Sequence, residues 1–433
     1  MKIYSFPRGG LSFVDPTVPP RDSSVAAFLP GLSVIPMIQH SGGRAFPVVS
    51  VGDTVKEGML IGRGRGEGSA NIHAAVPGRV IRTVSWQMGA GFTNDALVIR
   101  MGGGFERLGR REEVFPWEAL SAYELQRVIA EYGVVEMEGS GRPVAELISS
   151  HRINRGALTL VVRGVFDDPW LAADYVLCRE RLKAVAEGCH IMIRACRAGR
   201  ALFVFSRGEK DLGEALLAEA GGWDVPSSLA LTGSRYPQRN RRELELVLRA
   251  YEKREALELG ALLILGPATL AAVHDAVKLK KPILDRYVAV GGSAVKQPQV
   301  MKVRIGTRIG EILAECGGFV DKPKRIAAGS PLLGRTVSDL DEPVIKTTYA
   351  VFAMLGNQTG ALAERNCISC GECREVCPVG LDPEELYKQR RGQTSEKDSG
   401  EAEACHGCGC CEVVCPSRLP LSRVILRDQR RGE

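Results

Sequence analysis

The chain has 433 residues, of which 45% are hydrophobic and 25% charged, with a formal net charge of +6. This composition is ordinary for a globular protein and excludes a disordered or collagen-like chain, and the length predicts about three domains. The charge is small for this size, and the sequence has no stretch that mixes aromatic and basic residues, so we expect no nucleic-acid partner.

The sequence contains neither an apolar run of the roughly 18 residues that a transmembrane helix needs nor the apolar core of a secretory signal. We therefore expect a protein that stays in the cytoplasm and reaches a membrane only through partners. Eight of the 13 cysteines stand at the regularly spaced positions of two runs near the C-terminus. A disulfide framework is not expected in such a chain. The other five cysteines are expected to be buried, inert thiols: Cys178, Cys189, Cys196, Cys316 and Cys410.

Residues 1–115 are rich in Gly, Pro and Asp and lack helical periodicity. Short apolar pairs are separated by turns such as Gly52-Asp53 and Pro77-Gly78, which indicates a compact all-β unit. These turns resemble those of the lipoyl and biotinyl barrel-sandwich domains. Carrier domains of that fold attach their group to a lysine at a hairpin tip, but residues 63–73, the corresponding stretch, contain no lysine. We therefore expect a structural or docking role.

Residues 120–285 alternate between strand and helix patterns. Apolar runs predict buried strands, and amphipathic stretches with short connections separate them; the strands are expected at 158–163, 202–206, 228–232 and 262–266. This order predicts a parallel, Rossmann-like sheet covered by helices. Such a sheet often binds a nucleotide at the carboxyl ends of its strands.

The usual sign of nucleotide binding is a glycine-rich loop whose amides meet a phosphate. The nearest loop here is residues 138–143, and its candidates for an FMN or NADH site are Gly139, Gly141 and Arg142. The loop has two glycines where a phosphate-binding loop usually has three or more. An ordinary turn explains it equally well.

Residues 286–345 begin with two short β stretches, followed by a helical stretch at 309–316 that Gly317-Gly318 ends. A β-β-α unit of this size predicts a small β-grasp domain, of the type that binds ligands.

Residues 360–426 contain two cysteine runs of the form C-x2-C-x2-C-x3-C-P. This is the spacing of bacterial two-cluster ferredoxins, in which the fourth cysteine of each run ligates the other cluster. We therefore predict a helical ferredoxin-type domain with two [4Fe–4S] clusters. The ligands of the first would be Cys367, Cys370, Cys373 and Cys415. The ligands of the second would be Cys377, Cys405, Cys408 and Cys411. Zinc sites are the alternative, but they usually place pairs of cysteines far apart.

The order of the four units resembles RnfC, a component of the Rnf ion-translocating electron-transport complex. The resemblance covers most of the chain. It rests on both cysteine runs behind an N-terminal sandwich and on short matches upstream, among them Gln39-His40, Tyr236-Pro237-Gln238 and residues 304–307. A cobalamin reductase of microcompartments shares these modules, but its α/β domain comes first.

The resemblance implies FMN and NADH binding in an α/β domain like that of the flavin subunit of respiratory complex I. The family's glycine-rich loop aligns with residues 138–143, and its acidic stretch with residues 164–169. Both stretches depart from the family pattern here. Side chains replace glycines where a flavin phosphate would approach the backbone, so the binding of FMN and NADH stays open.

The resemblance further implies a peripheral electron-transfer subunit on the cytoplasmic side of the inner membrane. Electrons would pass between NADH or a ferredoxin and membrane partners through the two clusters. One alternative is a docking scaffold whose nucleotide site is non-functional and which takes electrons from a ferredoxin or flavodoxin. A second is a stand-alone flavin and iron–sulfur reductase such as a cobalamin reductase.

Overall fold

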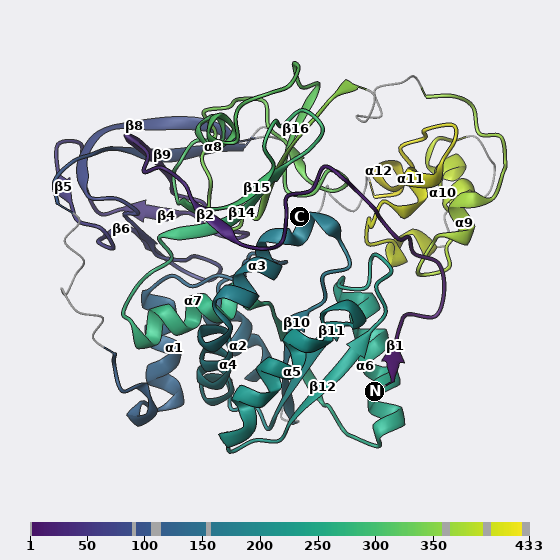
Figure 1. Cartoon of the computed structure of the whole chain (residues 1–433), viewed down its shortest axis with the longest axis horizontal. Coiled ribbons are helices and arrows are strands. Elements are labelled where there is room, and N and C mark those ends of the chain that lie inside the picture. Colours follow the sequence, from purple (N-terminus) through teal and green to yellow (C-terminus); the bar gives the residue numbers. More distant parts are fainter. Residues whose placement is uncertain are drawn as a thin grey trace.

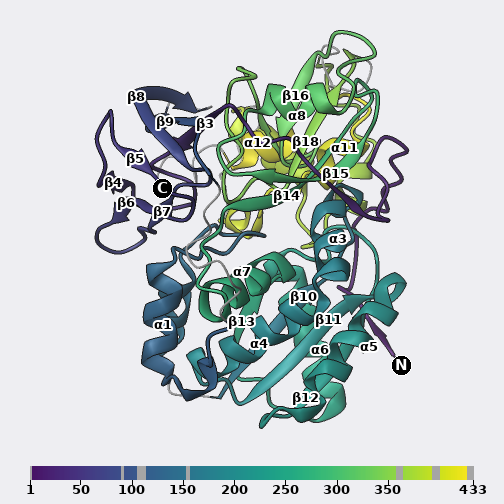
Figure 2. The same cartoon turned by 60° about the vertical axis from the view of Figure 1, so that its left-hand side comes forward.

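The computed structural model describes residues 2–88, 92–104, 114–152, 157–356, 364–392 and 400–426. These residues form two β units, an α/β unit and a helical C-terminal unit, which lie side by side in Figures 1 and 2. Within the described ranges, no helix has the length and apolar character needed to cross a bilayer. The predicted fold class, a multidomain α/β protein with these four kinds of unit, is confirmed.

The α/β unit is built on five parallel strands in the order β1-β12-β11-β10-β13. They are β1 (Ile3–Tyr4), β10 (Leu158–Gly164), β11 (Arg200–Ser206), β12 (Ser227–Thr232) and β13 (Ala261–Leu265). In β10, Leu160 and Val162 belong to the core on one face, and Val161 to the core on the other. Both faces are thus covered, as a parallel sheet with apolar strands requires.

Seven helices are described in this unit (Figure 1). They are α1 (Ala122–Glu131), α2 (Val144–Arg152), α3 (Ala172–Glu180), α4 (Leu182–Cys196), α5 (Lys210–Glu219), α6 (Arg241–Glu255) and α7 (Pro267–Lys278). Helices α4 and α7 approach closely because residue 188 is glycine: a Cβ there would lie 1.9 Å from the carbonyl oxygen of Leu270.

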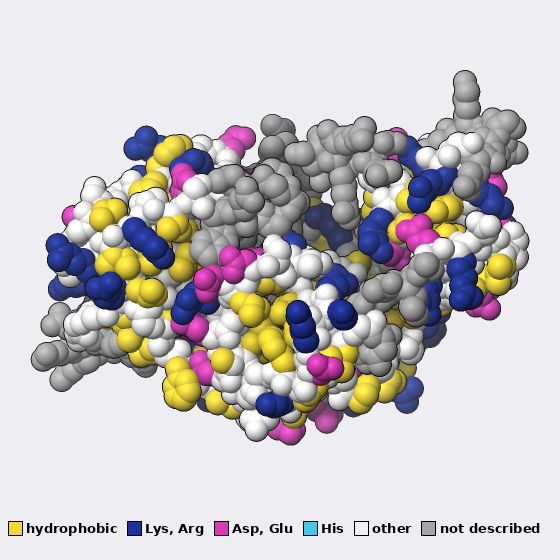
Figure 3. Space-filling view, turned by 90° about the horizontal axis from the view of Figure 1, so that it is seen from above, with side chains coloured by type: hydrophobic (Ala, Val, Ile, Leu, Met, Phe, Trp, Pro, Cys, Tyr) yellow, Lys and Arg dark blue, Asp and Glu magenta, His cyan; other side chains and the backbone are white. Residues whose placement is uncertain are grey.

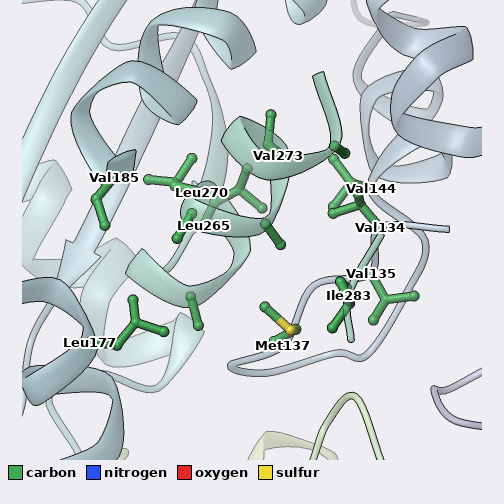
Figure 4. Packing of buried hydrophobic residues seen from close by; sticks show 14 of the residues in the cluster. Val134, Val135, Met137, Val144, Leu177, Val185, Leu265, Leu270, Val273 and Ile283 are labelled. Atoms are coloured by element: carbon green, nitrogen blue, oxygen red, sulfur yellow. The ribbon is translucent and has the colours of Figure 1, made fainter. Parts of the chain in front are cut away.

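The loop after α1 packs against α7. Figure 4 shows Val135 and Met137 on this loop and Leu270 and Val273 on the helix. All four side chains belong to one buried cluster. The backbone N–H of Met137 donates to the Thr269 hydroxyl at 2.9 Å. The residues that follow in the loop are therefore held at the N-terminal end of α7.

The N-terminal β unit is a sandwich of two sheets. One has the order β3-β9-β8-β5 and the other β4-β6-β7. The first contains β3 (Leu32–Pro36), β5 (Thr54–Val55), β8 (Gly78–Met88) and β9 (Phe92–Met101). The second contains β4 (Ala45–Pro47), β6 (Leu60–Gly64) and β7 (Ile72–His73). Buried Ile35, Ile61 and Ile72 from both sheets fill the space between them.

The second β unit has six strands in the order β17-β16-β18-β14-β15-β2. Its strands are β2 (Ser24–Ala26), β14 (Asp285–Gly291), β15 (Gln299–Arg304), β16 (Arg325–Ala328), β17 (Arg335–Thr336) and β18 (Ala350–Met354), and its helix is α8 (Ile309–Glu315). Ile309, Ile312 and Leu313 of α8 are buried in this unit's own core.

Three strands lie outside the ranges that the sequence predicts for their sheets. β1 and β2 fall within residues 1–115, yet β1 joins the α/β sheet and β2 joins β15 in the second β unit. β18 follows residue 345 but pairs with β14 and β16. β1 and β2 are only two and three residues long and carry too little pattern to be assigned. β18 has five buried residues but follows the range predicted for this unit.

The described part of the C-terminal unit contains four short helices: α9 (Glu372–Glu375), α10 (Pro383–Arg390), α11 (Cys410–Val414) and α12 (Leu421–Ile425). Tyr387, Leu419, Leu421 and Val424 form a small core with cysteines from both runs. This core is small for independent stability. Tyr387, Leu419 and Leu421 also line the first of the two sulfur-lined cavities described next. Figure 3 shows the surface of the whole molecule from above, with charged side chains of both signs spread over it.

Candidate functional site

Eight cysteines line two cavities in the C-terminal unit. The first cavity is lined by Cys367, Cys370, Cys373 and Cys415. The second is lined by Cys377, Cys405, Cys408 and Cys411, together with Cys410. Each cavity thus takes three cysteines from one run and one from the other. The structure brings together both sets that the spacing predicts, and the ligand role of each cysteine remains a prediction.

The backbones of the two runs share one conformation. Ser369 and Gly407, which precede the second cysteine of each run, have φ values of 52° and 70°, and Gly371 and Gly409, which follow it, have values of 79° and 78°. Two residues in the left-handed backbone conformation so close together turn the chain tightly. Glycine adopts this conformation without steric cost. The repeated conformation explains how each x2 spacing turns successive cysteines toward one cavity.

Backbone amides also point at the sulfurs. The N–H of Ser369 donates to Sγ of Cys367 at 3.4 Å, and the N–H of Leu381 donates to Sγ of Cys377 at 3.3 Å. Such donors stabilise negative charge on a thiolate ligand and adjust a cluster's potential. Four thiols, apolar walls and amide donors fit a [4Fe–4S] cluster in each cavity. Among the described residues, no His, Cys, Asp or Glu group is arranged to hold a single metal ion.

The two cavities differ in their access to solvent. Cys367 and Cys370 of the first set are exposed, and Ile368 between them is 67% exposed. Every cysteine of the second set is buried or partly buried. The Tyr236 hydroxyl of the α/β unit donates to the carbonyl oxygen of Cys408 at 2.8 Å. The first cavity therefore faces the surface, and the second faces the α/β unit.

A larger cavity of about 680 Å³ lies where three units meet. Its volume is in the range of small-molecule sites. Its walls come from the loop after α1, strands β10 and β13, the start of α6, the second β unit and the second cysteine run. Residues from each of these segments are Glu136, Arg163, Ile264, Arg242, Tyr349 and His406. His406 makes the second cysteine run part of the cavity wall.

Only one of the three predicted nucleotide-binding residues reaches this cavity. Gly139 lines it, and a Cβ on Gly139 would lie 3.0 Å from Oε1 of Glu136. Gly141 turns toward the N-terminal sandwich, where its carbonyl accepts from the N–H of Ser41 at 3.2 Å. Arg142 forms an ion pair with Glu146 one turn along the chain and is not part of the cavity wall.

Glu138 lies at this end of the cavity. No sequence pattern identified it as a site residue. Its carboxylate accepts the backbone N–H of Thr269 at 2.9 Å and also the Thr269 hydroxyl. Its backbone carbonyl accepts from Arg163 at 3.0 Å and from Arg239 at 2.8 Å. Arg163 also pairs with Glu136 at 3.3 Å. The only sequence signal was Pro267, which predicts that a helix starts there.

Burial raises the pKa of Glu138, and the charges of Asp174 and Glu136 raise it further. The α7 amide and the two arginines are the kinds of group that bind a phosphate in nucleotide folds. Here they already hold a carboxylate and a carbonyl of the chain itself. The residues at this position therefore do not fit the phosphate of a flavin.

Asp167 and Asp168, in the acidic stretch of residues 164–169, are both buried. Asp167 accepts the N–H of Arg239 at 3.1 Å, and Asp168 caps a short helical turn by accepting the N–H of Trp170 at 2.8 Å. Burial raises the pKa of Asp167 to about 7 and that of Asp168 to about 6. Only Asp168 lines the cavity.

Four family models match successive parts of the chain, in the order of the units described above. They are the RnfC barrel sandwich hybrid domain at residues 14–103, the Nuo51 FMN-binding domain at 129–274, the SLBB domain at 287–336 and a 4Fe-4S dicluster domain at 364–419.

Similar proteins are also known over most of the chain. The C subunit of the ion-translocating oxidoreductase complex of Rhodobacter capsulatus is 31% identical over 363 residues, which cover 83% of this chain and 69% of that protein. The C subunit of the proton-translocating ferredoxin:NAD(+) oxidoreductase complex of Clostridium ljungdahlii is 29% identical and is covered to 78%. A similarly named Pseudomonas aeruginosa protein is 32% identical, and this chain spans about half of it (47%).

Among solved structures, an air-oxidized NAD+-reducing [NiFe]-hydrogenase shares the fold. Its TM-score is 0.51 at 16% sequence identity, and the match covers 75% of this chain and 61% of that one.

Proposed function

Since this chain belongs to the RnfC family, we propose that it is a peripheral electron-transfer subunit of a membrane-bound, ion-translocating oxidoreductase. Its partners are the other subunits of that complex, and it sits on the cytoplasmic side of the cell membrane. It passes electrons between a soluble carrier, NADH or a ferredoxin, and the membrane subunits. The observation that carries this proposal is the pair of cavities, each lined by four cysteines from both runs.

In this proposal, Cys367, Cys370, Cys373 and Cys415 hold one [4Fe–4S] cluster. Cys377, Cys405, Cys408 and Cys411 hold the other. Each cluster, when bound, carries one electron at a time. The chain fixes the eight sulfurs, donates amide hydrogens to two of them and surrounds them with apolar side chains.

The different exposure of the two cavities supports a direction for the path. Cys367, Ile368 and Cys370 stand at the surface, where a redox partner can approach within electron-transfer distance. The second set lies against the α/β unit through Tyr236 and His406. The first set is therefore the exchange point with a protein partner, and the second set lies on the interior side.

Anaerobic purification followed by iron analysis and electron paramagnetic resonance tests the proposal. We expect about eight irons per chain and, after reduction with dithionite, the signals of two [4Fe–4S] clusters. Protein that retains zinc and no iron under the same conditions would contradict it. Cys316→Ala, which changes a buried cysteine of the second β unit, is the matched control and should keep the full iron content.

A further inference from the structure

We propose that the carboxyl group of Glu138 takes the phosphate position of this nucleotide-type fold. The α/β unit consequently retains no FMN and binds no NADH, and electrons reach the clusters only by contact with redox proteins. This inference deepens the proposed function, on which it rests, because it names the class of the soluble partner: an iron–sulfur or flavin carrier protein rather than a free nicotinamide.

The N-terminus of α7 is already occupied by Glu138. The first amides of a helix have no partner within the helix and carry a partial positive charge. In α7, Gly266 is the N-cap residue and Pro267 contributes no N–H. The next donors include the N–H of Thr269, which Glu138 already takes at 2.9 Å, and the Thr269 hydroxyl donates to the same carboxylate. An incoming phosphate would have to displace Glu138.

Glu138 also fills the space beside the start of α7. Glu138 is only 8% exposed. Its carboxyl carbon would lie 2.5 Å from a Cβ built on Gly266, so the side chain lies directly on the backbone of the helix start. The glycine at this position thus makes room for Glu138 itself.

The two arginines near Glu138 already have partners within the chain. Arg163 and Arg239 both donate to the backbone carbonyl of Glu138, at 3.0 and 2.8 Å. Arg163 also pairs with Glu136, and both of these side chains are nearly inaccessible to solvent. Arg239 also lies close to Asp167, which accepts its backbone N–H at 3.1 Å, so both arginines already have acidic neighbours. A phosphate would add at least one uncompensated negative charge in a buried site, which is costly.

The loop is also fixed at both sides of Glu138. The N–H of Met137 donates to the Thr269 hydroxyl, and the N–H of Glu136 donates to the carbonyl of Arg142 at 2.8 Å. Gly141 is bonded to Ser41 of the N-terminal sandwich. Moving the backbone of this loop away from α7 would break several of these bonds together. The arrangement is therefore that of a filled site.

The test uses the full chain with its clusters, purified anaerobically, and FMN as the probe. Binding is followed by quenching of FMN fluorescence in the wild type and in three variants. We expect no binding by the wild type at concentrations up to about 100 µM, and at least about tenfold tighter binding by Glu138→Ala, which frees the Thr269 amide. Glu138→Gln should not bind, because its amide oxygen can still accept from Thr269.

Glu245→Ala is the matched control. Glu245 lines the same cavity, but it belongs to α6 and pairs with Arg241. Glu245→Ala should, like the wild type, bind no FMN. If Glu138→Ala keeps its clusters and does not gain FMN binding, the role given to Glu138 is wrong. One flavin per chain in the purified wild type, or micromolar FMN binding by it, overturns the inference as a whole.

A second measurement needs no variant, and so holds even if Glu138→Ala fails to fold. NADH is added to the wild-type protein under argon, and the cluster absorbance is recorded before and after a further addition of dithionite. We expect reduction by dithionite and none by NADH. Reduction by NADH would overturn this inference while leaving the proposed electron transfer intact. Absence of iron would instead overturn the proposed function, so the two failures are distinguishable.

Discussion

At the scale of single residues, the cysteines act in crossed sets. Cys415 lies in the second run but lines the first cavity, and Cys377 does the reverse. We predict that Cys415→Ser damages the cluster of the first run, and that Cys377→Ser damages that of the second. Because each run contributes to both clusters, either change should also lower the stability of the whole C-terminal unit.

Electron paramagnetic resonance of the two variants tests this prediction. Cys415→Ser should weaken the signal of the first cluster, and Cys377→Ser should weaken that of the second. Cys410→Ala is the control, since Cys410 lies beside the second set but outside its spacing. If Cys415→Ser instead removed the cluster of the second run, the ligand sets would be uncrossed.

A buried aspartate gives a second prediction at this scale. Burial raises the pKa of Asp167 from 3.8 to about 7, so the folded protein binds more protons than the unfolded one between these values. Stability from this group is therefore present below about pH 4 and is lost as the pH rises to about 7. Asp167→Asn cannot ionise. It should be more stable than the wild type at pH 8, by about 1–3 kcal/mol.

Thermal unfolding of both proteins at pH 5 and pH 8 measures this effect. The melting temperature of the variant should exceed that of the wild type at pH 8, and the difference should shrink at pH 5. An equal difference at both pH values would show that ionisation of Asp167 is not its cause.

At the scale of elements, the contact of α4 with α7 positions the helix end that Glu138 caps. Gly188 lies at this contact, and a Cβ there would lie 1.9 Å from the backbone of Leu270. We predict that Gly188→Ala separates the two helices and destabilises the protein by about 1–3 kcal/mol, the usual cost of overpacking.

The change is measured as a lower midpoint of chemical unfolding. Gly213→Ala should lower the unfolding midpoint less than Gly188→Ala does, because its Cβ would meet only side chains, at 2.8 Å or more. Gly199→Ala is the neutral control, with open space around its Cβ. If Gly188→Ala unfolded with the wild-type midpoint, the two helices would not be in the close contact described.

The sequence predicted most elements correctly where their pattern was long. The apolar runs of β10, β11, β12 and β13 indicate buried parallel strands, since such strands are apolar on both faces. Helices α3 and α4 are separated at Arg181, whose guanidinium donates to Asp275 of α7 at 2.6 Å. A bond to a distant residue leaves no local pattern.

At the scale of the whole molecule, Lys346 joins three units. Its ammonium group donates to the carbonyls of Asn71 in the sandwich and Gly133 in the α/β unit, both at 2.8 Å. Burial lowers its pKa to about 7. Lys346→Met would leave both carbonyls without this donor, and we predict a loss of about 1–3 kcal/mol together with faster proteolysis between the units.

Limited proteolysis and thermal unfolding test this prediction. Lys253→Met, at the exposed end of α6, should change neither. A variant of Lys346 that resists protease as well as the wild type does would show that other contacts hold the three units together.

Sequence alone determined the two groups of four cysteines, the order of the four units and the parallel sheet, because short-range spacing and periodicity encode them. Only the tertiary structure decided what fills the nucleotide-type site. Glu138 and Thr269 are 131 residues apart, and no local pattern predicts that they meet. Their meeting depends on α4, α7 and the loop after α1 packing together, and a carboxylate takes a helix N-terminus only once that packing has brought it there.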